Sequence, residues 1–430
     1  MQANQSVRPG GLDRAQYLRH FLIIATGNGA AQVINLLGYP FLARLYSPQE
    51  FGLFGLFVAA AAIPSTVACG RFEFAIPTAP KSGAASVLWL SFLVSVAMGF
   101  ISTAVVWAFW WATAKTTQTS FPLLLGLCVA LTGVCAASSL FLMRYEGYRT
   151  VSASVLVRTA VSVGSQIGLA FIAPVASSLV IGFALGLAAQ AILLITIVRR
   201  RANPGAPRRR KIGMMFVRYR KQVLVDFPST LIAAVALNIL TFAIGILYDP
   251  RTIGFYSIGN RLAVVPLALF NDALAQVFFQ KASRAKEQKG HMWDELKFSL
   301  FASGILSCAV LVVIVLFARP FIGIFLGPRW LPAADMLVLL APMLAIRSLA
   351  MSIATTVFVL RSAHWLFFHN VATVILPLAA FAAARVFHLT PTAFIAIASA
   401  LLFAEYALFG GFLAFAARRD RNPADTIAKI

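Results

Sequence analysis

The sequence predicts an all-α integral membrane protein, with about twelve transmembrane helices in two parallel six-helix lobes and with both termini in the cytoplasm. Three observations support this fold class: the composition, the placement of the basic residues, and a short connector that occurs twice. Hydrophobic residues make up 60% of the chain and charged residues only 12%, whereas about a quarter of an average soluble domain is charged. Such a composition is typical of a protein embedded in a lipid bilayer.

Twelve apolar stretches are long enough to cross a bilayer, which requires about 20 predominantly apolar residues per helix. Turn residues and short basic segments separate them. The predicted spans are residues 20–43, 51–70, 84–111, 119–142, 151–172, 175–198, 222–247, 252–280, 297–318, 333–360, 364–385 and 391–417. No small-residue cleavage site follows the first stretch, so we expect it to be retained as a span.

The chain carries a formal net charge of +22, and its basic residues are concentrated in a few short segments. With the N-terminus in the cytoplasm, 27 of the 36 Lys and Arg residues fall in cytoplasmic segments, six in the opposite loops and three within spans. Basic residues favour the cytoplasmic side of a membrane, so this asymmetry supports twelve spans with both ends inside. In a soluble protein the same charge would indicate nucleic-acid binding. Here we expect contact with membrane lipid and no nucleic-acid partner.

A basic segment in the middle of the chain, "RRRANPGAPRRRK", separates the first six spans from the last six. The predicted domains are therefore an amino-terminal six-helix lobe (1–198), a basic cytoplasmic linker (199–221) and a carboxy-terminal six-helix lobe with a short basic tail (222–430). Each basic residue near an anionic membrane surface contributes about 1 kcal/mol. We therefore expect the linker to contact lipid head groups.

The connector between the first two spans is similar in the two lobes. It reads "LYSPQEFGLF" in the first and "LYDPRTIGFY" in the second, with Leu, Tyr, Pro and Gly at the same positions. In both copies a Ser or Asp precedes Pro, which is typical of a helix N-cap followed by Pro in the first helical position. We expect Gly52 and Gly254 to let neighbouring backbones approach closely. Because six spans is an even number, the two copies run in the same direction. Transporters built from parallel repeats bind substrate between the lobes.

The sequence carries no pattern of a soluble catalytic site. It has no phosphate-binding loop for ATP, and its four Cys and five His residues lack metal-ligand spacing. We therefore expect no enzyme activity, no cofactor and no metal. The absence of a large loop outside the membrane also argues against a membrane glycosyltransferase or polymerase.

Charged side chains within predicted spans are the strongest functional signal, because each costs at least about 2.5 kcal/mol at the bilayer centre on insertion scales, and such residues commonly face a cavity. Arg261 and Arg347 lie deepest, whereas Arg158 lies near a span end, where a snorkelling side chain is the simpler explanation. Internal salt bridges and hydrogen bonds between helices are the competing interpretation for these residues. The predicted substrate-binding residues are Arg261, Arg347, Arg158, Asn35, Asn238, Asn260 and Asn271, and the predicted ion-coupling residues are Glu405 and Asp272.

The sequence resembles the O-antigen-type oligosaccharide flippases of polysaccharide biosynthesis, in the multidrug/oligosaccharidyl-lipid/polysaccharide (MOP) exporter superfamily. The resemblance rests on "LYSPQEFGLF", "GRFEFAIP", "GFYSIGNRLAVVP" and "FLGPRWLPAA". It implies two lobes forming a V with a cationic cavity. It also implies transport of undecaprenyl-diphosphate-linked oligosaccharide across the bacterial plasma (inner) membrane, for O-antigen, capsule or exopolysaccharide assembly. A polysaccharide polymerase and chain-length proteins are then the further expected partners.

The resemblance implies alternating access without ATP. Arg261 and Arg347, together with Arg158, would hold the diphosphate, because the planar fork of arginine bonds two phosphate oxygens at once. Glu405 or Asp272 would couple transport to a proton or sodium gradient, unless it pairs with one of these arginines. An ion-coupled multidrug or cation exporter is the alternative, although spans one, three, four, five and six have no buried acid. A membrane glycosyltransferase or polymerase is a more distant one.

Overall fold

The computed structural model describes residues 14–80, 83–113, 120–202, 209–360, 362 and 364–420. In these residues every regular element is a helix. The helices are α1 (Arg14–Leu45), α2 (Pro48–Thr66), η1 (Phe72–Ala75), α3 (Ala84–Thr113), α4 (Ser120–Arg144), α5 (Tyr148–Ala170), α6 (Ala176–Ala202), α7 (Arg209–Leu247), α8 (Pro250–Lys289), α9 (Trp293–Phe325), η2 (Pro328–Trp330), α10 (Leu331–Ser352), α11 (Thr356–Val359), α12 (His364–Phe387) and α13 (Pro391–Arg419).

Each predicted span falls on a long helix, although several ends differ, and two spans depart from the prediction in shape. The second ends at Thr66 and not at residue 70, because the chain turns through Gly70 and Arg71 with φ of 58° and 67°. The tenth is interrupted by a turn between Ser352 and Thr356, which separates α10 from the short α11. Within the described ranges, nine helical segments are long and apolar enough to cross a membrane. The predicted all-α membrane fold is thus confirmed.

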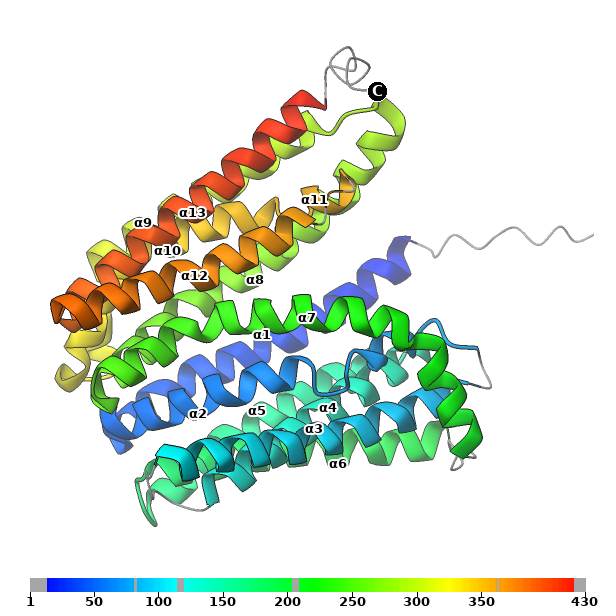
Figure 1. Ribbon diagram of the computed structural model, residues 1–430, viewed down its shortest axis with the longest axis horizontal. Helices are drawn as coiled ribbons and strands as arrows, with labels where there is room; N and C mark the ends of the chain where they lie inside the picture. The colour runs from blue at the N-terminus through cyan, green and yellow to red at the C-terminus, as the bar shows by residue number, and fades with distance from the viewer. Residues whose placement is uncertain are drawn as a thin grey trace, which may run out of the picture.

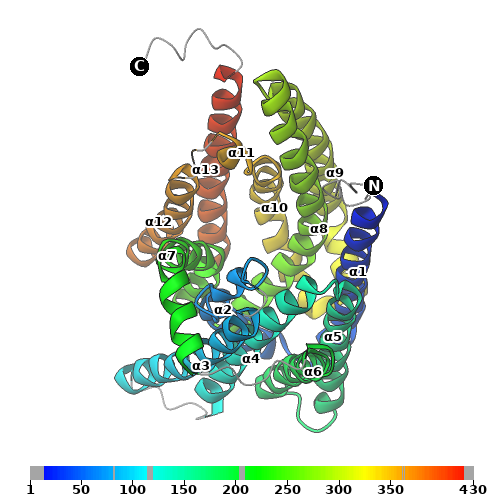
Figure 2. The same ribbon diagram turned by 90° about the vertical axis from the view of Figure 1, so that its right-hand side faces the viewer.

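The helices form two lobes that pack together at one end of the molecule and diverge toward the other (Figure 1). Helices α2–α6 make up most of the first lobe and α8–α13 most of the second, while α1 and α7 lie on opposite sides between them (Figure 2). Helix α7 packs against both α12 and α2. Both copies of the repeated connector lie at the end where the lobes meet, so the predicted parallel arrangement of the halves is confirmed.

The two copies of the connector contact each other. Ser47 accepts a hydrogen bond from the backbone N–H of Glu50 at the start of α2, and Asp249 caps α8 in the same way. A Cβ atom built on Gly52 would lie 1.7 Å from the carbonyl oxygen of Pro250, and one on Gly254 would lie 1.9 Å from that of Pro48. Only glycine fits at either position, so the predicted close approach of backbones is confirmed.

Trp330 closes the same end from the second lobe. Its side chain is fully buried, and its indole Nε1–H donates a 2.9 Å hydrogen bond to the carbonyl oxygen of Ala43 in α1. Its ring also meets Phe51 of α2 and Phe255 of α8 edge-on, with centroids 5.3 and 6.0 Å away. One side chain of the loop after α9 therefore joins three helices across the lobe interface.

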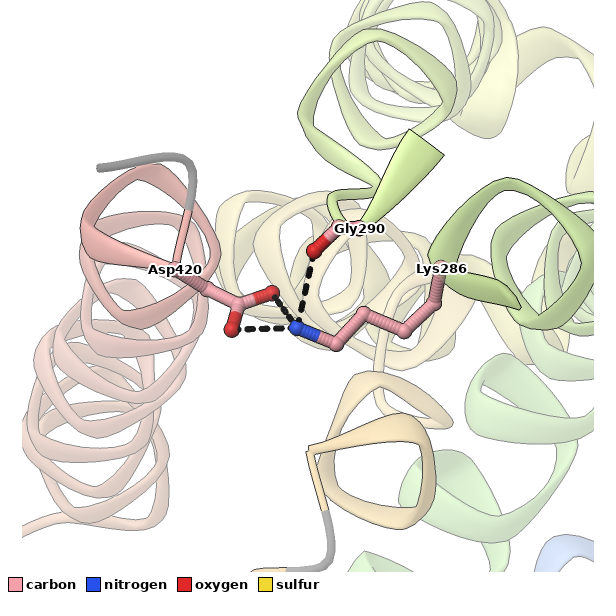
Figure 3. A network of polar contacts seen from close by, with 3 residues as sticks. All are labelled: Lys286, Gly290 and Asp420. Carbon is pink, nitrogen blue, oxygen red and sulfur yellow. Dashed lines mark hydrogen bonds and ion pairs between the residues drawn. The ribbon is translucent and has the colours of Figure 1, made fainter. Parts of the chain in front are cut away.

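At the opposite end, a salt bridge joins α8 to the end of α13 (Figure 3). The ammonium of Lys286 lies 2.5 Å from both carboxylate oxygens of Asp420 and donates a 3.0 Å hydrogen bond to the carbonyl oxygen of Gly290. Gly290 ends α8 in the left-handed conformation, with φ of 76°, which glycine adopts without steric cost. These contacts tie the first and last helices of the second lobe together.

Arg144, at the end of α4, holds the segment between α2 and α3. Its Nη1 donates hydrogen bonds to the carbonyl oxygens of Ile76, Pro77 and Ala79 at 2.6, 3.2 and 2.6 Å. Glu73 is buried in the same segment, and its Oε2 has no hydrogen-bond partner among the described residues. Burial raises the pKa of the Glu73 carboxyl above its ordinary value.

Candidate functional site

A cavity of about 610 Å³ lies where the first lobe meets α8. Helices α1, α2, α5 and α6 form most of its wall, and α8 contributes the part that belongs to the second lobe. Helix α1 packs along α5 and also touches α8, so it is shared by both sides of the cavity. The lining residues are Asn28, Ala31, Gln32, Asn35, Tyr39, Leu42, Phe51, Phe54, Val155, Arg158, Thr159, Ser162, Val163, Gln166, Leu179, Phe183, Arg261 and Val264.

Two arginines from different lobes face this cavity. The guanidinium of Arg158, on α5, lies 5.5 Å from the ring centroid of Phe183. That of Arg261, on α8, lies 5.5 Å from the ring centroid of Phe54, and its Nη1 donates a 3.4 Å hydrogen bond to the hydroxyl of Tyr39. Among the described residues, neither guanidinium has a carboxylate within ion-pair distance. Aromatic faces hold both cations in place without neutralising them.

One face of α1 supplies a polar row to the cavity. Asn28, Gln32, Asn35 and Tyr39 follow one another at spacings of three or four residues, which places them on the same side of a helix. Amide and hydroxyl groups of this kind can both donate and accept hydrogen bonds. The row therefore suits a ligand rich in hydroxyl groups.

Hydrogen bonds within the first lobe join the connector end of the cavity wall. The hydroxyl of Tyr46, just after α1, donates a 2.7 Å hydrogen bond to the carbonyl oxygen of Gln166. The side-chain amide of Gln166 in turn donates a 2.9 Å bond to the carbonyl oxygen of Leu179 in α6. These bonds fix α5 and α6 relative to the connector, so the Gln166 amide nitrogen serves the wall and not a ligand.

The other predicted substrate-binding residues do not line the cavity. The Asn238 amide donates to the carbonyl oxygen of Ala234 within its own helix. Asn271 accepts a 2.7 Å hydrogen bond from Ser348 and so links α8 to α10. Asn260 lies on α8 beside Arg261 but is not among the lining residues.

Arg347 also lies away from the cavity, within the second lobe. It is half-buried on α10, within electrostatic reach of the hydroxyls of Tyr256 on α8 and Tyr406 on α13. The sequence-based prediction places Arg261 and Arg347 in one site. In the structure, Arg261 lines the cavity together with Arg158.

The two predicted ion-coupling residues have different outcomes. Glu405, on α13, is buried and pairs with His369 on α12, with Nδ1 and Oε1 2.7 Å apart. No ion pair joins it to Arg347 in the described part of the chain. The side chain of Asp272 lies outside the described residues.

Sequence reasoning missed the aromatic residues of the cavity and the partner of Glu405. Tyr39 could have been found, because it continues the helical spacing of the polar row on α1. Phe54 and Phe183 carry no comparable signal, since apolar rings are common in spans. His369 was overlooked because its partner lies 36 residues away on the next helix.

The family model described as "Polysaccharide biosynthesis protein" matches residues 41–335, which is more than half of the chain. The chain belongs to this polysaccharide biosynthesis family. The matched region includes both cavity arginines and both copies of the connector. No curated protein matches the chain.

Solved structures of MOP superfamily transporters share the fold of this family member. An inward-facing multidrug resistance MATE family transporter is 12% identical, with a TM-score of 0.66 over 92% of this chain and 99% of that one. The lipid II flippase MurJ in an inward closed conformation is 14% identical, with a TM-score of 0.68 over 93% and 89% of the two chains. A MOP superfamily transporter from Pyrococcus furiosus, described as having a binding pocket of reverse polarity, is 11% identical, with a TM-score of 0.59 over 94% of this chain and 96% of that one. At these identities the likeness shows the fold alone.

The family and the fold together confirm the resemblance drawn from the sequence motifs. They make this chain a multi-pass membrane protein of polysaccharide biosynthesis with a MOP transporter fold, and they support a transporter of the flippase type.

Proposed function

We propose that the protein is a flippase that moves undecaprenyl-diphosphate-linked oligosaccharide repeat units across the bacterial plasma membrane for surface polysaccharide assembly. The observation that carries this proposal is the pair of arginines, Arg158 and Arg261, that face one cavity from different lobes without a carboxylate partner among the described residues. A diphosphate supplies the missing negative charge. The polar row on α1 and the aromatic rings nearby would contact the sugars.

The position of the two arginines on different lobes links binding to movement. An anion that bonds Arg158 and Arg261 at once stabilises the arrangement in which the two helices are close, and it loses one partner when the lobes separate. A ligand shifts a conformational equilibrium only through such a difference in affinity between states. The lipid-linked substrate would thus drive alternating access without ATP.

The charge of the cavity favours an anionic substrate over a cationic drug. Two guanidiniums in a partly desolvated site repel cations, because Coulomb interactions strengthen as the effective dielectric constant falls. Among the described residues, the cavity is lined by no acidic side chain. The exporter of cations considered from the sequence lacks a comparable observation in its favour.

The orientation of the protein in the membrane belongs to the same proposal. One end of the bundle carries the start of α1, the end of α13 and the residues on either side of the 203–208 segment. This end is strongly basic, and we propose that it faces the cytoplasm. The connectors would then lie at the outer surface. A polysaccharide polymerase and chain-length proteins would take over the product there.

The test compares Arg158→Ala and Arg261→Ala with Arg149→Ala, an exposed arginine at the start of α5. Loss of a charge-assisted hydrogen bond costs about 1.5–3 kcal/mol, so each cavity variant should bind undecaprenyl diphosphate roughly 10- to 100-fold more weakly in nanodiscs. In cells, surface polysaccharide should be lost and lipid-linked repeat units should accumulate, with the protein present at normal abundance.

Replacement by lysine sharpens the same test. Arg261→Lys keeps the charge but loses the planar fork, so it should restore binding only partly. The proposal is wrong if both alanine variants bind the lipid and export polysaccharide as well as Arg149→Ala does.

A further inference from the structure

The second lobe contains a buried ionisable pair that is separate from the cavity. Nδ1 of His369 on α12 lies 2.7 Å from Oε1 of Glu405 on α13, and the two side chains are 4% and 10% exposed. The other carboxylate oxygen of Glu405 is buried and has no hydrogen-bond partner among the described residues. Most buried carboxylate oxygens have a hydrogen-bond partner, so the unpartnered oxygen of Glu405 is a notable feature of this pair.

Aromatic rings fix the imidazole of His369 in place. It stacks on Phe409, with centroids 4.1 Å apart and an interplanar angle of 17°, and it meets Tyr406 at 5.3 Å. Phe409 lies one helical turn beyond Glu405, so α13 supplies the carboxylate and both rings. The imidazole therefore cannot turn away from the carboxylate without losing this packing.

The charge on the pair depends on a single proton. With one proton the pair is neutral overall, either as imidazolium and carboxylate or as imidazole and carboxylic acid. Without it the pair carries one uncompensated negative charge, which is costly in a medium of low dielectric constant. One proton therefore decides whether the pair is neutral or negatively charged.

The surroundings of the pair contain one described cation that could respond to this change. Helix α10 packs against α13 and carries the half-buried Arg347, which lies within electrostatic reach of Tyr406 beside the pair. Helix α11 has no ionisable residue, and the charged residues of α9 lie near its ends. Over its membrane-spanning part, α7 has an acid only at Asp226, its first residue. The other ionisable residues of α10, α12 and α13 are Asp335, His364, Arg385, Arg418 and Arg419, at or near helix ends, together with Tyr406.

We propose that His369 and Glu405 form a proton-binding site that couples a proton gradient to the movement of the lobes, an inference that rests on the proposed transport function. A proton from water on one side binds to the pair, and the same proton leaves to water on the other side after the lobes move. No other bond forms or breaks. When the pair is deprotonated, its negative charge attracts Arg347.

Helix α8 connects this site to the cavity. Arg347 lies within electrostatic reach of Tyr256 on α8, and the same helix carries Arg261 into the cavity little more than one turn further along. A shift of Arg347 toward the deprotonated pair changes its interaction with α8. The protonation state of the second lobe therefore acts on the helix that bears one of the two substrate-binding cations.

The experiment measures the conformational response to pH without substrate, so that it is independent of the flippase assignment. Spin labels at Arg149→Cys on α5 and Gln288→Cys on α8 would report the distance between the lobes, in nanodiscs and in a background without the four native cysteines. Both positions are exposed. For one coupled proton, the ratio of two conformers changes by up to about tenfold per pH unit. From about pH 5.5 to about pH 8.5, we expect this ratio to change by at least about tenfold.

Two variants and one control assign the response. Glu405→Gln can still hydrogen-bond His369 but cannot titrate, and His369→Gln removes the imidazole, so each should abolish the pH response. Asp335→Asn removes the acid of an exposed pair with Arg319 and should leave it unchanged. An infrared difference spectrum between the two pH values should contain a protonated-carboxyl band that Glu405→Gln lacks.

The proposal is overturned if the protein shows no pH response, if the response persists in Glu405→Gln and His369→Gln, or if sodium at constant pH produces it. Surface polysaccharide export by the same variants is measured in parallel. A pH response that depends on the pair, in a protein that does not export polysaccharide, would refute the proposed substrate and leave the proton site standing. Normal polysaccharide export without the pH response would refute the proton site and leave the proposed transport function standing.

Discussion

Single residues decide the sign and position of charge in this protein. Arg158 and Arg261 meet rings and a hydroxyl and, in the part of the chain that the structure describes, no acid. Their positive charge is therefore available to a ligand. Glu73 is the opposite case, since its carboxyl is buried close to the end of α2 and one of its oxygens has no hydrogen-bond partner within the described ranges. Such a group costs stability whenever it is ionised.

Glu73 should make the stability of the protein fall as pH rises. Burial raises its folded-state pKa above the ordinary value of 4.5, although a backbone hydrogen bond and Arg71 oppose the shift. The folded state therefore holds the proton more tightly than the unfolded state. Its contribution to the free energy of unfolding is greatest below pH 4.5 and declines as pH rises through the folded-state pKa. Glu73→Gln should flatten this part of the pH profile and raise the melting temperature at neutral pH.

Thermal unfolding in detergent, measured from below pH 4.5 to neutral pH, would check this prediction. Glu287→Gln, an exposed acid on α8, is a matched control and should leave the profile unchanged. An unaltered profile in Glu73→Gln would show that the carboxyl is not desolvated in the folded protein.

At the scale of elements, α2 and α8 meet through two glycines, and this contact defines how the lobes close at the connector end. The helices start together because each has a capped turn beginning with proline. Trp330 then covers the contact from the second lobe. Opening this end requires the helix contact and the indole hydrogen bond to break together.

A side chain on either glycine should keep this end from closing. In Gly254→Ala the new Cβ would lie 1.9 Å from the Pro48 carbonyl oxygen, and backbone atoms cannot move aside cheaply. We expect the lobes to separate at the connectors, with a Cys at the buried Ile253 reacting several-fold faster with a thiol reagent. Gly164→Ala, where nothing lies within 4 Å, should behave as the parent. Equal reactivity of the two variants would contradict the closed-end role of the contact.

At the scale of the whole molecule, the distribution of basic residues predicts which end faces the cytoplasm. Cysteines at Gly205, which lies outside the described residues, and at Pro332, which is exposed at the start of α10, should differ in labelling by an impermeant maleimide. In intact spheroplasts, Pro332→Cys should react and Gly205→Cys should not. The reverse pattern would invert the protein in the membrane and place the connectors inside.

Much of the fold could be predicted from the sequence because it depends on local signals. Apolar runs, N-cap residues followed by proline, and basic segments predict the helices and the parallel lobes. The site was less accessible, because it depends on which helices face one another. Arg158 looked like a span-end residue, yet α5 turns it toward α8. Arg347 looked equivalent to Arg261, yet α10 lies inside the second lobe. The pairing of His369 with Glu405 likewise exists only after α12 and α13 pack together.

The reciprocal contact of the two connectors has an evolutionary consequence. Gly52 meets Pro250 as Gly254 meets Pro48, which is the pattern of a two-fold interface between identical subunits. A six-helix ancestor with one connector could therefore have dimerised through this surface before gene duplication and fusion joined the copies. Residues 1–202 and 209–430, expressed as separate chains, should still associate, and Gly254→Ala should weaken that association. Halves that never assemble would argue against a dimeric origin.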